Sequence, residues 1–207
     1  MAGEGLGFIG AGSKCAVIVA HPDDETLWAG GLMLMHPDAR WIVVTICRKS
    51  DADRAPKFYK TLEKYNAEGF MADLDDGPEQ TPLNGGDIRK AILELLPSHE
   101  FDLIITHNPS GEYTRHLRHE ETANAVLDLW KSDKLSADNL WIFAYEDGNR
   151  KYLPRAIEEA DLVVDLTEET WKRKYDIITG VYGFGNDSFE AKTTPKREAF
   201  WCFDDKS

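Results

Sequence analysis

The chain has 207 residues, of which 42% are hydrophobic and 29% charged, a composition that fits one globular domain of ordinary size. Its formal net charge of −13 disfavours nucleic acid and anionic membrane surfaces as partners, because both repel an acidic surface. No segment approaches the roughly 18 apolar residues of a membrane span, and the N-terminus lacks the basic start of a signal peptide. The three cysteines form no CxxC pair and indicate buried thiols in a reducing compartment, so we expect a cytoplasmic protein.

Strand and helix patterns alternate along the chain. Apolar and β-branched runs predict strands at 15–19, 41–47, 71–74, 101–106, 141–145 and 162–165. Helical spacing of apolar residues predicts helices at 25–35, 53–68, 87–97, 119–130 and 168–178. From residue 183 we expect loop, apart from a short aromatic segment at 200–203. The repeated βα units predict a single α/β domain with a mostly parallel, doubly wound sheet over residues 14–207, preceded by a flexible segment at 1–13.

A polar cluster, Ala20-His21-Pro22-Asp23-Asp24-Glu25, directly follows the first predicted strand. Carboxylates at the buried end of a strand need a partner cation, and a catalytic zinc site usually has three protein ligands and one open position. His21 and Asp24 supply two ligands, and Asp23 between them is placed to act as a general base. The alternative is that Asp24 and Glu25 only favour the start of the following helix.

A second polar cluster, at 111–121, follows the predicted strand 101–106. In a doubly wound sheet both clusters lie at the edge where ligands bind. His116 and His119 are three residues apart at a helix start, so both imidazoles point to the same side. One can bind a metal and the other can hydrogen-bond to the substrate or protonate it. The combined pattern predicts one divalent metal site, suited to Zn²⁺ and also to Fe²⁺.

The segment 20–25 resembles the signature of the PIG-L/LmbE-like zinc-dependent N-acetylglucosaminyl deacetylases, and the segment 116–119 resembles the family's second signature, His-Pro-Asp-His. The resemblance extends over roughly residues 14–180 and implies a Rossmann-like three-layer sandwich. It implies that His21, Asp24 and His119 hold Zn²⁺, that Asp23 is the base, and that His116 acts on the reacting carbonyl. The implied reaction removes an N-acetyl group from a small acetamido substrate, such as an N-acetylglucosamine-type sugar conjugate.

The chain departs from the family pattern between and around these histidines. Leu117-Arg118 replaces the family's Pro-Asp, so His116 needs another partner, for which Glu112 and Glu120 are candidates. The spacing from Tyr113 to His116 is one residue longer than in the family, which makes an oxyanion role for Tyr113 less secure.

Further candidates follow other predicted strands. Arg48 begins Arg48-Lys49-Ser50, which replaces the family's Gly-Glu, and Glu146 follows the strand at 141–145. We take Arg48, Tyr113 and Glu146 as candidate substrate-binding residues. His107 is expected to be a hydrogen-bonded structural histidine, and the acidic run at 73–76 a solvated turn.

Three other functions fit parts of the pattern. The same site could hydrolyse another acyl amide or an ester, or the protein could bind a metal or ligand without catalysis. A nucleotide-binding Rossmann protein is disfavoured, because the GxGxxG match at 5–10 precedes the first strand instead of following it. The sequence leaves the oligomeric state open, a homo-oligomer included.

Overall fold

The computed structural model describes residues 9–113 and 115–204, which form a sheet of seven strands in the order β3-β2-β1-β4-β5-β9-β8. The strands from β3 to β5 pair in parallel, and β9 pairs antiparallel with both β5 and β8. A separate antiparallel pair joins β6 to β7. The strands are β1 (Lys14–Val19), β2 (Arg40–Thr45), β3 (Glu68–Met71), β4 (Glu100–Thr106), β5 (Ser136–Phe143), β6 (Tyr145–Glu146), β7 (Arg155–Ala156), β8 (Leu162–Asp165) and β9 (Arg197–Phe203).

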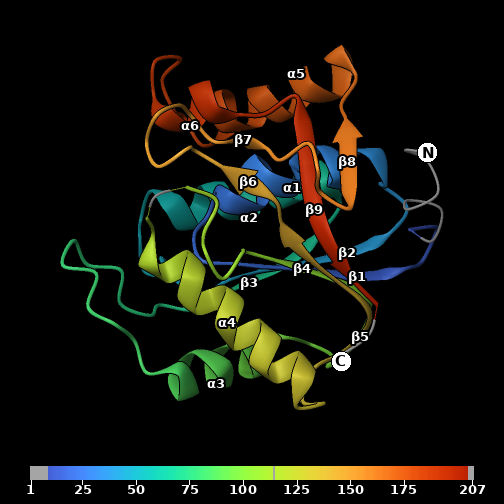
Figure 1. The fold of residues 1–207 in the computed structure, drawn as a ribbon, viewed down its shortest axis with the longest axis vertical. Coiled ribbons are helices and arrows are strands. Elements are labelled where there is room, and N and C mark those ends of the chain that lie inside the picture. Colours follow the sequence, from blue (N-terminus) through green and yellow to red (C-terminus); the bar gives the residue numbers. More distant parts are fainter. Residues whose placement is uncertain (1–8, 114, 205–207) are drawn as a thin grey trace.

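Helices cover both faces of the sheet, as Figure 1 shows. One face carries α1 (Asp24–Met35), α2 (Arg54–Tyr65), α5 (Glu168–Asp176), the π-helical turn η1 (Ile177–Val181) and α6 (Phe189–Thr193). The other carries α3 (Gly85–Leu95) and α4 (Leu117–Lys131). The continuous apolar run of β1 follows from this arrangement, because the strand is buried on both faces. Val17 and Val19 pack into one core, and Ala16 and Ile18 pack into the other. The mostly parallel, three-layer α/β fold predicted from the sequence is therefore confirmed.

Backbone conformation and helix capping account for three boundaries that differ from the prediction. The helix predicted at 53–68 ends at Tyr65, because Asn66 adopts the left-handed conformation with φ 52° and ends the helix. The next strand therefore spans Glu68–Met71 and shares only Met71 with the predicted 71–74. Helix α3 begins at Gly85, ahead of the predicted residue 87, because the Asn84 side chain caps it by accepting a hydrogen bond from Gly86 N.

The C-terminal segment is more ordered than the sequence predicted. The aromatic run at 200–203 is the end of β9, which lies between β5 and β8. Glu198 of β9 is fully buried, and its carboxylate accepts hydrogen bonds from Gly31 N (2.7 Å) and Leu32 N (2.8 Å) in the middle of α1. Lys174 of α5 pairs with the same carboxylate at 2.7 Å. Glu198 therefore ties the last strand both to α5, through Lys174, and to α1, through the two amides.

Residues 1–8 of the segment expected to be flexible at 1–13 lie outside the described residues. Within the remainder, Ile9 is buried, and the chain turns at 10–13 before entering β1. Among the described residues, no helix has the length and apolar character needed to cross a membrane.

Candidate functional site

A cavity of about 250 Å³ opens where strands β1 to β4 end. β1 and β4 are neighbours in the sheet, and the helices that follow them cover opposite faces, so the cavity lies at the topological switch point of the fold. We call it the site cavity. Its lining residues are His21, Pro22, Asp23, Asp24, Leu27, Arg48, Arg54, Asp76, Tyr113, His116, Phe189 and Glu190.

The turn after β1 holds Asp23 in an unusual conformation. Its φ of 113° and ψ of −30° are rare for a residue with a side chain and cost free energy unless the surroundings stabilise them. The stabilising group is the buried Glu25 carboxylate, which accepts a hydrogen bond from Asp23 N at 2.9 Å. Tyr182 Oη and Thr26 Oγ1 each donate to the same carboxylate at 2.7 Å. Glu25 therefore shapes the turn and is more than an acidic residue in a first helical turn.

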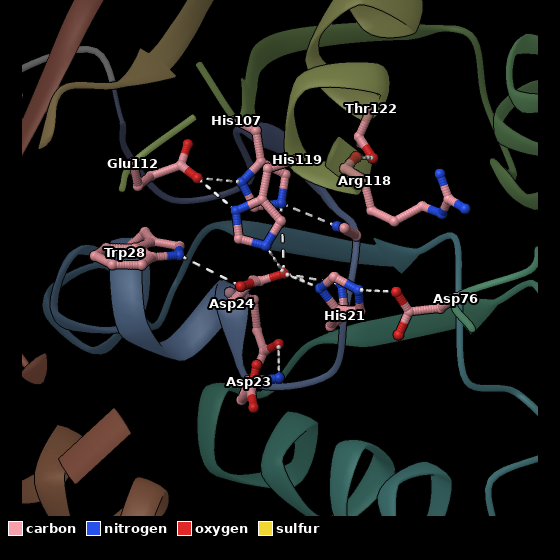
Figure 2. A network of polar contacts seen from close by, with 12 residues as sticks. His21, Asp23, Asp24, Trp28, Asp76, His107, Glu112, Arg118, His119 and Thr122 are labelled. Atoms are coloured by element: carbon pink, nitrogen blue, oxygen red, sulfur yellow. Dashed lines mark hydrogen bonds and ion pairs between the residues drawn. The ribbon is translucent and has the colours of Figure 1, made fainter. Parts of the chain in front are cut away.

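Asp24 lies where the two polar segments 20–25 and 111–121 meet, between His21 and His119, as Figure 2 shows. Its Oδ2 atom is 3.1 Å from His21 Nδ1 and 3.4 Å from His119 Nε2. His21 N also donates to Oδ2 at 2.8 Å, and Trp28 Nε1 donates to Oδ1 at 3.4 Å. The carboxylate is thus fixed from both sides, with one oxygen directed between two imidazoles.

His21 and His119 each have an outer ring nitrogen, the one that does not face Asp24, and a second carboxylate lies near it. Glu112, fully buried, accepts from His119 Nδ1 at 2.6 Å and from His107 Nδ1 at 3.0 Å. Asp76 Oδ1 lies 3.1 Å from His21 Nε2, in an ion-pair contact without hydrogen-bond geometry. Metal-binding histidines commonly face a carboxylate in this way, because it fixes the ring and increases its basicity.

Two sets of side chains lie close enough to share a divalent metal ion, because the ligand atoms of His21, His116 and His119, and likewise those of Asp24, His107 and His119, lie within 4.8 Å of one another. Ligand atoms about 2.1 Å from a tetrahedral zinc lie roughly 3.4 Å apart, and the contacts of Asp24 Oδ2 with His21 and His119 have this spacing. His119 Nε2 is buried and, among the described residues, has no hydrogen-bond partner. His107 also lies near Asp24, but its Nε2 accepts a hydrogen bond from Ala20 N at 3.0 Å and is therefore not free to bind an ion.

Burial and neighbouring charges set the protonation of the acidic groups. Burial opposes ionisation of Asp24 and Glu112, but the adjacent histidines outweigh it: the pKa of Asp24 falls well below its usual range and that of Glu112 to about 2. The pKa of Asp23 is raised, chiefly by burial and then by the Asp24 charge. Arg54 opposes this rise, because its Nη1 atom donates to Asp23 Oδ2 at 2.7 Å.

His116 lies over the two histidines but differs from them. Its ring centre is 4.6 Å from that of His21 and 4.5 Å from that of His119. Neither expected partner serves it, because Glu112 binds His107 and His119, and Glu120 binds Arg115. Burial and then the nearby His119 and His21 lower the pKa of His116 to about 3. His116 is therefore a neutral imidazole at physiological pH.

Arg118, which stands where the family has an acidic residue, has a role that the sequence did not predict. It is fully buried and donates hydrogen bonds to the carbonyls of Asp75 (2.6 Å) and Thr81 (2.7 Å). These bonds hold the segment after β3 against α4, which brings Asp76 to His21. The prediction that the acidic run at 73–76 is a solvated turn is thus wrong for Asp76, whose carboxylate also pairs with Arg48.

Of the candidate substrate-binding residues, Arg48 and Tyr113 line the site cavity and Glu146 does not. Glu146 is exposed on β6, where Tyr152 Oη donates to it at 2.7 Å and Arg155 pairs with it. Four residues that line the site cavity were not predicted to do so: Arg54, Asp76, Phe189 and Glu190. Arg54 and Asp76 lie in segments that follow β2 and β3, so the rule that ligands bind where parallel strands end could have identified them. Phe189 and Glu190 lie in the segment expected to be loop and gave no such signal.

The chain belongs to the PIG-L family, whose model, described as GlcNAc-PI de-N-acetylase, matches residues 16–130. It is 20% identical over 176 residues to the uncharacterized protein L374 of Acanthamoeba polyphaga mimivirus, covering 78% of this chain and 75% of that protein.

Two solved structures share the fold along nearly their whole length. One is the A40926 pseudoaglycone deacetylase Dbv21, with a TM-score of 0.63 and 15% identity over 93% of this chain and 98% of that one. The other is the conserved protein TT1542 from Thermus thermophilus, with a TM-score of 0.58 and 14% identity over 91% of this chain and 94% of that one.

Proposed function

We propose that this protein is a metal-dependent hydrolase that removes the acetyl group from an acetamido compound, with N-acetylglucosamine-type sugar conjugates as the substrate class. Membership of the PIG-L family supports a deacetylase-type hydrolase. The observation that carries the proposal is the geometry around Asp24. Its Oδ2 atom faces His21 Nδ1 and His119 Nε2 at metal-ligand spacing, and a carboxylate faces the other nitrogen of each ring.

His21, Asp24 and His119 would hold the ion. Zn²⁺ or Fe²⁺ bound there would polarise the acetamide carbonyl and make the attacking water more acidic. Asp23, in the same cavity and fixed by Arg54, accepts the proton of that water. His116, a neutral imidazole, donates a hydrogen bond to the carbonyl oxygen as negative charge develops on it. Asp23 or His116 then delivers a proton to the leaving nitrogen, and the products are acetate and a free amine.

The rim of the site cavity supports a polyhydroxylated substrate. Arg48, Arg54, Asp76 and Glu190 supply charged donors and acceptors around its lining. Sugar hydroxyls both donate and accept hydrogen bonds, so a mixed rim suits them better than it suits an apolar acyl chain. Arg48 is paired with Asp76, which orients both groups before a ligand arrives.

An acetate-release screen tests the proposal. The purified protein, loaded in turn with Zn²⁺ and Fe²⁺, is incubated with N-acetylglucosamine, its glycosides, other N-acyl glucosamines and simple esters. We expect acetate from the acetamido sugars, and loss of that activity after chelation with recovery on adding metal. Turnover of esters or longer acyl amides in place of acetamides would reassign the reaction, and metal-loaded protein inactive on the whole panel would contradict the proposed function.

A further inference from the structure

A second cavity, of about 360 Å³, lies directly beside the site cavity and shares two of its walls. The shared residues are Tyr113 and Phe189, whose ring centres are 5.2 Å apart. We call this second space the side cavity. Its other walls come from the turn between β6 and β7, on the same side of the sheet as α6 (Figure 1), and are Asp147, Arg150, Lys151, Tyr152, Leu153 and Pro154.

The side cavity presents apolar surface to solvent. Tyr152, Leu153 and Phe189 are 36%, 43% and 39% exposed, and all three line it. Exposed apolar side chains that gather beside a polar site indicate a binding surface, whereas singly scattered ones do not. Tyr113 links the two spaces, because its ring centre is 5.5 Å from that of His119 and it also contacts Phe189.

The wall formed by the β6–β7 turn is held in place. Lys151 N and Tyr152 N donate to Asp147 O at 3.0 and 3.2 Å, and Asn149 N donates to the Asp147 side chain at 2.9 Å. The Tyr152 ring lies against Gly148, where an added Cβ would approach the ring within 2.4 Å. The Arg155 guanidinium lies 4.1 Å from the centre of the same ring. A wall built in this way can bind a ligand without first becoming ordered.

We propose that the side cavity binds an apolar group, aryl or alkyl, attached to the acetamido compound whose acetyl group lies in the site cavity. The proposal rests on the proposed function for the position of the acetyl group. The continuity of the two cavities through Tyr113 and Phe189 places the apolar group on the same molecule as the acetamide. The polar rim then binds the sugar, and the Tyr152–Leu153 wall with Phe189 binds the group linked to it.

Calorimetric binding to the whole chain tests this inference with defined probes. These are the methyl, phenyl and octyl β-glycosides of N-acetylglucosamine, bound to the metal-loaded Asp23→Asn variant so that turnover does not interfere. We expect the phenyl and octyl glycosides to bind about tenfold or more tightly than the methyl glycoside, because the added group buries apolar surface. Leu153→Asp and Phe189→Ala should bring that ratio close to one, and Leu153→Asp, which lies outside the site cavity, should leave the Kd of the methyl glycoside unchanged. Tyr59→Ala, which removes an exposed aromatic residue elsewhere, should preserve the ratio.

The outcomes separate the two proposals. Equal Kd values for all three glycosides, or a preference that survives both Leu153→Asp and Phe189→Ala, would overturn the side-cavity inference even if the wild-type protein releases acetate. A preference that depends on these residues would support it even if no acetate is released, in which case the proposed function alone fails. Circular dichroism of each variant checks that a lost preference is not a loss of fold.

Discussion

The parallel part of the sheet and its antiparallel edge contribute different residues to the same place. The parallel part, with its loops, supplies the charged and imidazole groups: His21, Asp23, Asp24, Asp76, Glu112, His116 and His119. The edge, with the helices attached to it, supplies Phe189 and Glu190 to the cavity and the buried groups that support α1.

This difference has a physical origin. Loops after neighbouring parallel strands converge at one edge of a sheet, so reactive groups from distant parts of the sequence meet there. The antiparallel edge has no such requirement, and it and the helices beside it act through buried hydrogen bonds: Tyr182 Oη donates to Glu25, and the Glu198 carboxylate accepts from Gly31 N and Leu32 N in α1. We expect the parallel part to determine whether the reaction occurs. We expect the antiparallel edge to determine how well the reacting side chains are positioned and which substrate binds.

The largest effect is expected from His119→Ala. Removing a proposed ligand, whose imidazole Glu112 orients, should abolish stoichiometric metal binding and reduce acetate release below detection. Metal content by mass spectrometry and acetate assay measure both. His99→Ala, an exposed histidine at the opposite edge of the sheet, is the matched control and should retain both properties. A His119→Ala protein that keeps one tightly bound ion would exclude His119 as a ligand.

Asp23→Asn separates the proposed base from the proposed metal ligands. It keeps the size of the side chain but removes its ability to accept a proton, so we expect kcat to fall about 10²–10⁴-fold while the metal content stays the same. Asp53→Asn, an exposed aspartate that pairs with Lys57, should leave kcat unchanged. Near-normal turnover by Asp23→Asn would mean that another group takes the proton.

A smaller loss of activity is expected from a change at Tyr182, which follows η1 beside the antiparallel edge. Tyr182→Phe removes the hydrogen bond to Glu25, whose carboxylate fixes the Asp23 backbone at φ 113°. We expect kcat to fall about tenfold, the effect of weakening one buried hydrogen bond, with KM and metal content nearly unchanged. Tyr175→Phe, which loses only an exposed contact with Asn186, is the control. If both variants behave like wild type, Glu25 holds Asp23 without the help of Tyr182.

The smallest effect concerns the thiols. Burial, the main cause, together with nearby carboxylates raises the pKa of Cys15 and Cys47 to about 12, from 9.0 for a free thiol. Unfolded thiols therefore lose protons above pH 9 while native ones keep them, so their contribution to stability is present below pH 9 and is lost as the pH rises toward 12.

Two measurements check this. At about pH 8 the native protein should react with a thiol reagent more slowly at Cys15 and Cys47 than at the partly exposed Cys202. The denatured protein should react at all three cysteines. The thermal midpoint should fall between about pH 9 and about pH 10.5 more steeply than in a Cys15→Ala, Cys47→Ala protein. Equal native labelling of the three thiols would contradict the buried positions.

The sequence predicted the part of the molecule that obeys simple periodic rules. The apolar runs of β1, β2, β4 and β8 and the polar residues after β1 and β4 were enough to predict the sheet and to place His21, Asp24, His116 and His119 at one edge. Asp76 was misjudged because its position depends on Arg118, a buried arginine far along the chain that holds its loop.

The remaining misjudged features depend on tertiary contacts or on single backbone conformations. Asn66 ends α2 through a left-handed conformation that no periodicity reveals. The apolar pattern of β9 is interrupted by Glu198, a charged residue that is buried only because Lys174 and two amides of α1 satisfy it. Glu112 was considered as a partner of His116, but from sequence alone nothing showed that it would bridge His107 and His119.

The shared ion of His21, Asp24 and His119 is tested most directly by a crystal structure of the zinc-loaded protein with anomalous data at the zinc edge. We expect one anomalous peak in the site cavity, about 2.0–2.2 Å from His21 Nδ1, Asp24 Oδ2 and His119 Nε2, with Asp76 and Glu112 still facing the outer nitrogens of the two rings. An ion held by a different set of residues, or fully loaded protein with no peak between these three side chains, would contradict the proposed metal site and the reaction built on it.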